Sequence, residues 1–459
     1  MKKIIVLSVF YALFCSVAAA DTPRSHVLLI SIDGLVPDVY LDREKAAAAT
    51  PNLAALARRG VAADQVVTVF PSVTYPAHAT MVTGTNPATH RVSSNFQPGT
   101  TEWLANAADI KGTTLWHAAK QAGLTTAAVM WPMTYGADVN WLVTESSQAD
   151  RRDAGLHAAL QRGSTKGLLA RLAKQAGALP ADGQSEDDTV QAVDRMSAAY
   201  AAQILKDEKP DLTLVYFLEA DHMQHAHGPG STQAASAFKH IDAYIGTLLS
   251  ALKTAGIEER TNVIVVGDHG FAPVHTALNV NRLLLDLGYA RIEQGRLIND
   301  LVRFDSQAGS GAFYPLPGAS AQALAEFGQR LEALVNSRYR TLVDYVSAQQ
   351  LRELGGYPGA IAALSAAPGY MLVPLPVPYP AVATHHNRGM HGYLPDMPDM
   401  ATGLIAAGPA FQSGVRPPVL RLLDVAPTIG ALLGLALPAA EGSAIVGILN
   451  TPADPRSPL

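Results

Sequence analysis

Four short segments of this chain are apolar rather than alternating and are rich in β-branched residues. They are residues 27–32, 126–130, 212–217 and 262–266. Strands of this kind are typical of a parallel sheet that helices cover on both faces. Amphipathic patterns at residues 53–59, 115–122 and 237–254 supply such helices between the strands. The alternation predicts an α/β core with a mainly parallel sheet.

Residues 276–382 interrupt this pattern and are rich in Gly, Pro, Ala and Ser. One amphipathic helix is still expected there, at residues 324–335. The core pattern returns at residues 402–408, and residues 423–433 have the pattern of a closing helix. We therefore expect one core, made of residues 21–275 and 383–459, with residues 276–382 inserted as a cap.

The N-terminal residues 1–20 have the composition of a secretory signal peptide. Two lysines precede an apolar stretch at residues 4–14, and the segment ends in three alanines. Cleavage after Ala20 predicts a periplasmic or secreted protein without a remaining membrane span. An uncleaved anchor is the alternative, because residues 4–20 barely reach across a bilayer.

The composition of the chain limits its partners and its metal ligands. The single cysteine, Cys15, lies in the predicted signal peptide, so any metal ion must be bound by His, Asp or Glu. The 34 Lys and Arg residues against 39 Asp and Glu residues give a net charge of −5. Because surfaces that bind nucleic acids are basic, we expect no such surface here.

Acidic residues follow three of the predicted strands at their carboxyl ends. Asp33 follows the first strand, Glu219 and Asp221 follow the third, and Asp268 follows the fourth. These ends form the ligand crevice of an open parallel sheet. Carboxylates gathered there repel one another unless a cation or a shared proton neutralises them. A single Asp would usually be a helix cap or a turn residue, but three such sites favour a metal centre.

Histidines accompany these carboxylates. One helical turn separates Asp221 from His225, so both can face one ion, while His222 and His227 compete for that role. Carboxylates mixed with imidazoles suit Zn²⁺ best, with Mn²⁺ and Fe as alternatives. Two further histidines are candidates: His269, in the segment Gly-Asp268-His269-Gly, and His391, which is followed by a glycine.

Thr74 stands shortly before Pro76, which fits the first turn of a helix. The threonine is therefore expected at or just before a helix start. Free N–H groups and the positive dipole end at such a start suit an anion such as phosphate. A Thr at this place is usually only a cap. Beside metal ions, however, its hydroxyl can ionise and act as a nucleophile.

Six motifs contain these residues and occur in a fixed order: Asp33-Gly, Pro-Ser-Val-Thr74-Tyr-Pro, His90-Arg-Val-Ser-Ser-Asn95, Asp221-x3-His225-x2-Gly-Pro, Gly-Asp268-His269-Gly and Met-His391-Gly-Tyr. In this order the chain resembles the nucleotide pyrophosphatase/phosphodiesterases of the alkaline phosphatase superfamily. The resemblance covers roughly residues 25–440 and is weakest over residues 276–382. It implies an alkaline-phosphatase-like, three-layer α/β core with an inserted cap.

The resemblance also implies two zinc ions and a phospho-threonine intermediate. One zinc ion would be bound by Asp221, His225 and His391. The other would be bound by Asp33, Asp268, His269 and Thr74. Thr74 would be the nucleophile, and Asn95 would donate a hydrogen bond to a phosphoryl oxygen. The enzyme so implied hydrolyses phosphodiester or phosphoanhydride bonds in a small-molecule substrate such as a nucleotide.

Residues 130–144 favour a diester or anhydride substrate, because they contain no basic residue. Threonine-type monoesterases of the superfamily carry a Lys and an Arg in this stretch. A phosphomonoesterase (alkaline phosphatase), a phosphonoacetate-hydrolase-like enzyme and an inactive metal-binding relative are the alternatives. Tyr75, next to the proposed nucleophile, is a candidate to stack on a nucleobase or to line an apolar pocket.

Overall fold

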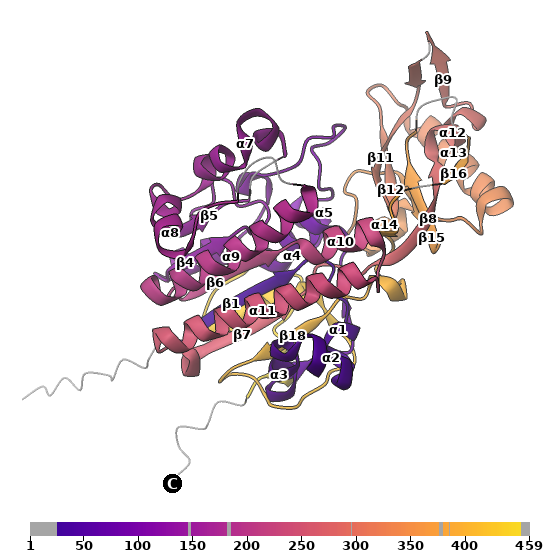
Figure 1. Cartoon of the computed structure of the whole chain (residues 1–459). Helices are drawn as coiled ribbons and strands as arrows, with labels where there is room; N and C mark the ends of the chain where they lie inside the picture. The colour runs from indigo at the N-terminus through magenta and orange to yellow at the C-terminus, as the bar shows by residue number, and fades with distance from the viewer. Residues whose placement is uncertain are drawn as a thin grey trace, which may run out of the picture.

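The structure is a computed structural model and describes residues 25–145, 148–180, 185–294, 296–375, 380–384 and 386–450. Its centre is a seven-stranded sheet (Figure 1). In spatial order the strands are β2 (Val61–Ala62), β18 (Leu404–Ala407), β7 (Thr261–Val266), β1 (His26–Ile32), β6 (Leu212–Phe217), β4 (Thr126–Val129) and β5 (Trp141–Val143). The five strands from β7 to β5 are parallel, whereas β18 is antiparallel to β7 and β2 is antiparallel to β18.

All four predicted strands are present, as β1, β4, β6 and β7. Every residue of these strands is buried, because helices cover both faces of the sheet. This explains why their sequences are apolar throughout rather than alternating. The predicted α/β fold with a mainly parallel sheet is therefore confirmed.

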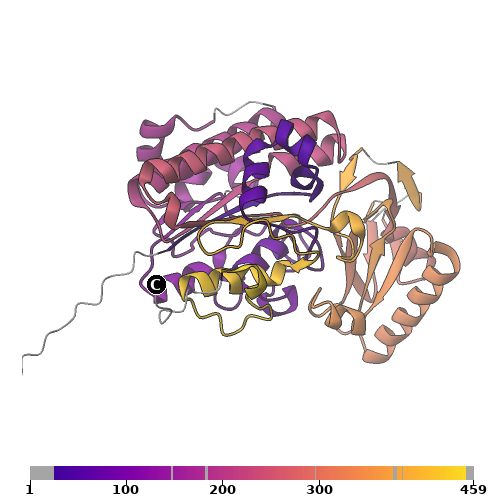
Figure 2. The ribbon, with the colours of Figure 1, turned by 90° about the horizontal axis from the view of Figure 1, so that it is seen from below.

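Two layers of helices enclose the sheet, one above and one below it in Figure 2. One layer contains α3 (Pro51–Arg59), α9 (Glu186–Glu208), α10 (Glu219–His227) and α11 (Thr232–Ala255). The other contains α4 (Thr74–Thr83), α6 (Leu115–Gln121) and α15 (Val425–Leu433). Shorter or peripheral elements complete the core: α1 (Asp38–Leu41), α2 (Arg43–Ala49), α5 (Pro87–His90), α7 (Gln148–Gly163), α8 (Leu168–Ala176), β3 (Val66–Val67) and β19 (Leu420–Arg421).

A second lobe lies beside one end of this core (Figures 1 and 2). One of its sheets joins β8 (Ala272–Asn279) to β15 (Gly369–Val373), β16 (Val382–Thr384) and β17 (Gly389–Met390). Another has the order β11 (Val302–Gln307), β12 (Ser310–Pro315), β14 (Ala362–Ala366) and β13 (Val343–Ser347). The lobe also contains β9 (Ala290–Glu293), β10 (Arg296–Asn299), α12 (Val280–Asp286), α13 (Ala321–Leu334) and α14 (Ala348–Glu353).

The lobe has an apolar cluster of its own, whose side chains come from residues 272–400. Its helix α13 agrees with the helix expected at residues 324–335. The boundaries of the cap at residues 276 and 382 stay a prediction, and the predicted signal peptide lies outside the described residues. Among the helices that the structure describes, none combines the length and the apolar character that a membrane span requires.

The carboxyl ends of the three central strands lie at the same level of the sheet. In the parallel pairing Ile32 of β1 is next to Phe217 of β6, and Ser31 is next to Val266 of β7. The acidic residues that follow these strands therefore start from one edge, as the sequence predicted. This edge is where the candidate site is found.

Candidate active site

Two clusters of carboxylates and imidazoles lie at this edge of the sheet. In each cluster one ligand-type atom per residue lies within 4.8 Å of the others. We call them the Asp33 cluster and the Asp221 cluster. The Asp33 cluster is Asp33, Asp268 and His269, and the Asp221 cluster is Asp221, His225 and His391. The structure thus brings together the six His and Asp residues that the sequence singled out, in the two predicted groups.

The Asp33 cluster is buried. None of its three residues is more than 2% exposed. His269 Nε2 lies 3.3 Å from Asp33 Oδ1 and 3.3 Å from Asp268 Oδ2. Meanwhile Asp268 Oδ1 accepts hydrogen bonds from the backbone N–H groups of Gly34 and His269, both at 3.0 Å. The backbone therefore holds one carboxylate oxygen of Asp268 and leaves the other facing the cluster.

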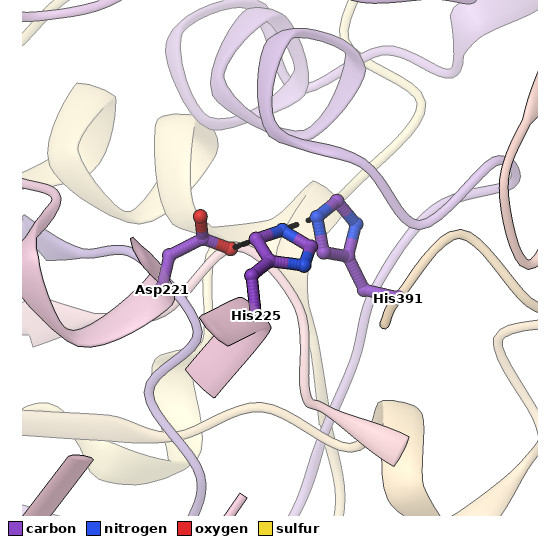
Figure 3. Close-up of side chains that lie close together, drawn as sticks. All are labelled: Asp221, His225 and His391. Atoms are coloured by element: carbon purple, nitrogen blue, oxygen red, sulfur yellow. Dashed lines mark ion pairs between the residues drawn. The ribbon is translucent and has the colours of Figure 1, made fainter. Parts of the chain in front are cut away.

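The Asp221 cluster is built from helix α10 and a distant loop. Asp221 Oδ1 lies 3.4 Å from His225 Nε2 and 3.6 Å from Nε2 of His391, which follows β17 (Figure 3). The competing histidines lie elsewhere. His222 Nε2 pairs with Asp187 Oδ1 at 2.6 Å, and His227 is exposed. The helix therefore presents His225, one turn after Asp221, to the cluster.

Each of the three imidazoles has its Nδ1 at a backbone carbonyl oxygen. Because a carbonyl only accepts, Nδ1 carries the proton and donates it, which leaves the Nε2 lone pair for a ligand. Hydrogen bonds of this kind orient the histidines of metal sites. The pairs are His225 with Gly389 at 3.0 Å, His269 with Gly270 at 3.1 Å, and His391 with Ser72 at 3.1 Å.

The two clusters are in contact with each other. The rings of His269 and His391 are stacked, with their centroids 3.6 Å apart. Burial, followed by the charges of Asp221 and Asp268, raises the pKa of Asp33 well above its usual value. Burial and the neighbouring His269 lower the pKa of His391 well below its usual value. The clustered carboxylates therefore repel one another, and a positive charge between them would relieve this repulsion.

Unpartnered polar atoms indicate where that charge belongs. Buried polar atoms in proteins normally have hydrogen-bond partners, and exceptions require an explanation such as an ion. Carboxylate oxygens and imidazole nitrogens are the ligands that Zn²⁺, Mn²⁺ and Fe take in proteins. The residues therefore fit metal ions. The buried atoms of the clusters that make no hydrogen bond are Asp33 Oδ1, Asp221 Oδ1, Asp268 Oδ2 and His269 Nε2.

Thr74 is the first residue of α4, after the N-cap residue Val73. Its hydroxyl does not cap the helix but lies 3.5 Å from Asp33 Oδ2. Thr74 is buried, with 7% exposed. Of the two interpretations that the sequence left open, the cap and the reactive hydroxyl, the position beside the Asp33 cluster favours the second.

Asn95 lies next to this helix start. Its Oδ1 accepts a hydrogen bond of 2.8 Å from the backbone N–H of Tyr75. Within the described part of the chain, its Nδ2 donates no hydrogen bond, so this donor is available to a ligand. The Tyr75 ring is only 2% exposed and packs edge-to-face on Trp103, and its hydroxyl bonds Glu145 at 3.0 Å. A contact of Tyr75 with substrate stays a prediction.

Two aromatic residues of the site escaped the sequence analysis. The Tyr216 hydroxyl bonds Asp33 Oδ2 at 2.5 Å. His78 bonds the Thr74 carbonyl oxygen at 2.8 Å and the Ser31 hydroxyl at 2.8 Å, and burial lowers its pKa to about 4. The i, i+4 spacing from Thr74 was a signal for His78. Tyr216 gave none, because it lies inside a continuously apolar strand.

A third residue of the site that the sequence did not indicate is Gln307, which comes from the second lobe at the end of β11. Gln307 is 6% exposed; its Oε1 accepts from Asn95 N at 3.4 Å and its Nε2 donates to Ser94 Oγ at 2.8 Å. The turn after it also supports the metal-ligand loop, because Gly309 N donates to the His391 carbonyl oxygen at 3.0 Å. The β11–β12 hairpin of the lobe therefore holds both Asn95 and His391 in place.

The sheet with its two clusters and threonine hydroxyl has the features of an alkaline-phosphatase-like hydrolase. Within that class, the chain belongs to the type I phosphodiesterase/nucleotide pyrophosphatase family, whose model matches residues 27–394. This confirms the predicted family. The chain is accordingly a hydrolase that acts on phosphodiester or phosphoanhydride bonds.

Individual relatives are distant in sequence. Mouse ectonucleotide pyrophosphatase/phosphodiesterase family member 7 is 23% identical over 445 residues, 91% of this chain and 86% of the relative. The bis(5'-adenosyl)-triphosphatase of Xenopus laevis is 23% identical and covers 91% of this chain and 79% of its own. An uncharacterized pyrophosphatase/phosphodiesterase of Schizosaccharomyces pombe is 29% identical over 54% of this chain, but that match covers only 45% of the yeast protein.

Solved structures show the same fold. Murine ectonucleotide pyrophosphatase/phosphodiesterase 5, as an inactive variant in complex with AMP, superposes with a TM-score of 0.65 at 21% identity. The superposition covers 93% of this chain and 100% of that structure. The likeness therefore extends over the core and most of the second lobe.

Proposed function

We propose that this chain is a secreted or periplasmic phosphodiesterase/nucleotide pyrophosphatase that uses two zinc ions and forms a phospho-threonine intermediate. The position of the Thr74 hydroxyl, 3.5 Å from Asp33 Oδ2 and unused for helix capping, carries the proposal. The predicted export rests on residues 1–20 and the family membership on the match over residues 27–394. Mn²⁺ or Fe are the alternative ions.

Each of the two clusters would bind one of the ions. The Asp221 cluster would hold one ion, and the Asp33 cluster together with the Thr74 hydroxyl would hold the other. When bound, such ions lower the pKa of a coordinated hydroxyl and neutralise charge on the attacking and leaving oxygens. The histidine Nε2 atoms and the unpartnered carboxylate oxygens of the clusters are the donors that this arrangement needs.

The reaction follows from the positions of the remaining groups. Thr74 Oγ1 attacks phosphorus and a P–O bond to the leaving group breaks, while Asp33 Oδ2, 3.5 Å from the hydroxyl, accepts its hydrogen bond. Asn95 Nδ2 donates to a phosphoryl oxygen, while its Oδ1 is held by Tyr75 N. Water then hydrolyses the phospho-threonine and regenerates the hydroxyl.

A substrate panel tests the proposal. We expect kcat/KM for bis-p-nitrophenyl phosphate and p-nitrophenyl thymidine monophosphate to exceed that for p-nitrophenyl phosphate by about tenfold or more. The reason is that residues 130–144 offer no Lys or Arg to a doubly charged phosphate. A clear preference for p-nitrophenyl phosphate would instead make the phosphomonoesterase correct.

Gln307 provides a prediction about positioning. Replacing it with Met keeps its length but removes the hydrogen bonds to Asn95 and Ser94, so Asn95 is held less firmly. Loss of a hydrogen bond of about 1 kcal/mol corresponds to a decrease of roughly fivefold in kcat, with a smaller change in KM. Steady-state kinetics with bis-p-nitrophenyl phosphate measure both constants.

The matched variant for this prediction is Gln307→Glu. It retains an acceptor for the Asn95 N–H, and Ser94 can donate to its carboxylate in place of accepting, although the hydrogen bond of 2.8 Å that Gln307 Nε2 donates to the Ser306 carbonyl oxygen is lost. We expect its kcat to lie closer to that of the unmodified protein than the kcat of the Met variant. Equal kcat values for the unmodified protein and Gln307→Met would show that the lobe does not position Asn95.

A further inference from the structure

A cavity of about 800 Å³ lies between the loop of residues 91–102 and the second lobe. The core side of the cavity is formed by this loop. The lobe side is formed by residues of β11 and β12, together with Tyr357 and Pro358. A cavity of this volume is in the range that holds a small-molecule ligand. Neither the residues of the two clusters nor Thr74 lines it.

The inner wall of the cavity is directly linked to the candidate active site. Ser94 and Gln307 both line the cavity and are hydrogen-bonded to each other at 2.8 Å. Gln307 Oε1 also accepts from the backbone N–H of Asn95, the proposed contact of the phosphoryl group. If Asn95 binds the phosphoryl group, the cavity is next to that group on the side of the lobe. A substituent of the phosphorus atom can therefore extend into it.

The lining suits a ligand that is polar and planar but not strongly charged. Hydroxyl and amide side chains come from Ser93, Gln97 and Thr100, among others. The charges of the lining are balanced, because they come from two arginines and two carboxylates. Arg303 is moreover held by Asp305 through two hydrogen bonds of 2.7 Å. The charged side chains of the lining are Arg91, Glu102, Arg303 and Asp305.

Aromatic rings complete this chemistry. Phe96 lines the cavity from the core side and Tyr314 from the lobe side, where the Arg303 guanidinium lies 5.3 Å from the Tyr314 ring centroid. Nucleobases stack on aromatic rings and on arginine, and ribose hydroxyls bond to polar side chains. A neutral nucleoside therefore matches the lining better than a free phosphate, which would require an excess of positive charge.

We propose that this cavity binds a nucleoside in the leaving arm of the substrate, that is, in the group displaced from phosphorus by Thr74. This rests on the proposed function and adds to it the class of the leaving group. The phosphates occupy the metal clusters, and the nucleoside beyond them lies between the 91–102 loop and the lobe. Substrates with a second nucleoside, such as dinucleoside polyphosphates, then gain binding energy that a p-nitrophenyl leaving group does not.

The test compares two substrates that differ in the leaving arm, diadenosine triphosphate and p-nitrophenyl thymidine monophosphate. We expect Thr100→Trp, which fills the cavity from an exposed loop position, to lower the ratio of their kcat/KM values by about tenfold or more. Phe96→Ala removes a stacking surface and is expected to lower the same ratio by about tenfold. The matched control is Thr254→Trp, on the exposed end of α11, which is expected to leave the ratio unchanged.

A ratio that stays within twofold of the unmodified protein in both cavity variants would overturn the inference. Failure of the unmodified protein to hydrolyse diadenosine triphosphate, while it hydrolyses the p-nitrophenyl ester, would overturn it as well and leave the proposed function standing. Failure to hydrolyse either substrate would overturn the proposed function itself. Circular dichroism spectra of the variants show whether each one is folded.

Discussion

Thr74→Ala is expected to lower the turnover of bis-p-nitrophenyl phosphate by roughly a thousandfold or more, because the variant has no group in place to attack phosphorus. The hydroxyl contributes only one of the ligands of its cluster, and Asp33, Asp268 and His269 remain. Metal content should therefore stay close to that of the unmodified protein. Turnover assays and elemental analysis of the dialysed protein measure the two quantities.

The control for this variant is Thr74→Ser, which retains a hydroxyl at the start of α4. We expect it to keep measurable activity. When its reaction with a slowly hydrolysed substrate is quenched with acid, we expect residue 74 to carry the covalent intermediate. Mass spectrometry of the labelled peptide detects the added phosphoryl group together with the substituent that it retains from the diester. Substantial turnover by Thr74→Ala, with its metal ions bound, would remove Thr74 from the role of nucleophile.

Removal of metal ions is expected to have an effect of similar size on activity and to lower the melting temperature. Asp33 and Asp268 are buried and Asp221 is partly buried beside them. Burial together with the other two carboxylates raises the pKa of Asp33. A bound cation stabilises the folded state, since the unfolded chain has no such site. A chelator should therefore abolish hydrolysis and reduce the melting temperature, and added Zn²⁺ should restore both.

Asp268→Asn tests the same point within the chain. In the unmodified protein the unpartnered Oδ2 of Asp268 faces His269. The variant should therefore bind less metal and lose activity by roughly a thousandfold. Asp242→Asn is the matched control, because Asp242 is also a buried carboxylate but bonds the start of α3 through Asn52 and Leu53. Its metal content should match that of the unmodified protein. Unchanged metal content in Asp268→Asn would contradict the assignment of the Asp33 cluster.

Much of the site followed from local patterns. Apolar runs predicted the strands, and an acidic residue at the end of a parallel strand points to the crevice, so the sequence itself indicates Asp33, Asp221 and Asp268. The spacing of four residues placed His225 on the face of Asp221. This kind of reasoning succeeds because strand and helix geometry repeats along the chain and does not depend on what lies beside it.

The contacts of the other histidines of α10 depend on the packing of that helix. The sequence favoured His225 over His222, which points elsewhere on a helix, and over His227, which abuts the Gly-Pro break, but it did not reveal what these two histidines contact. In the structure α10 packs on α9, so that His222 reaches Asp187 there, and His225 is the histidine that meets His391. The role of Tyr216 could not be predicted for a similar reason. The sequence of a strand whose residues are all buried does not show what the hydroxyl of a tyrosine within it contacts.

Short-range periodicity was thus enough to assign the α/β core, the acidic strand ends and the position of Thr74 at a helix start. The contribution of the second lobe came from long-range contacts alone. Gln307 meets Asn95 across 212 residues of sequence, and the cavity beside them exists only where the lobe lies against the 91–102 loop. Contacts between segments so far apart are selected by the shape and burial of whole surfaces, which no local window of sequence contains.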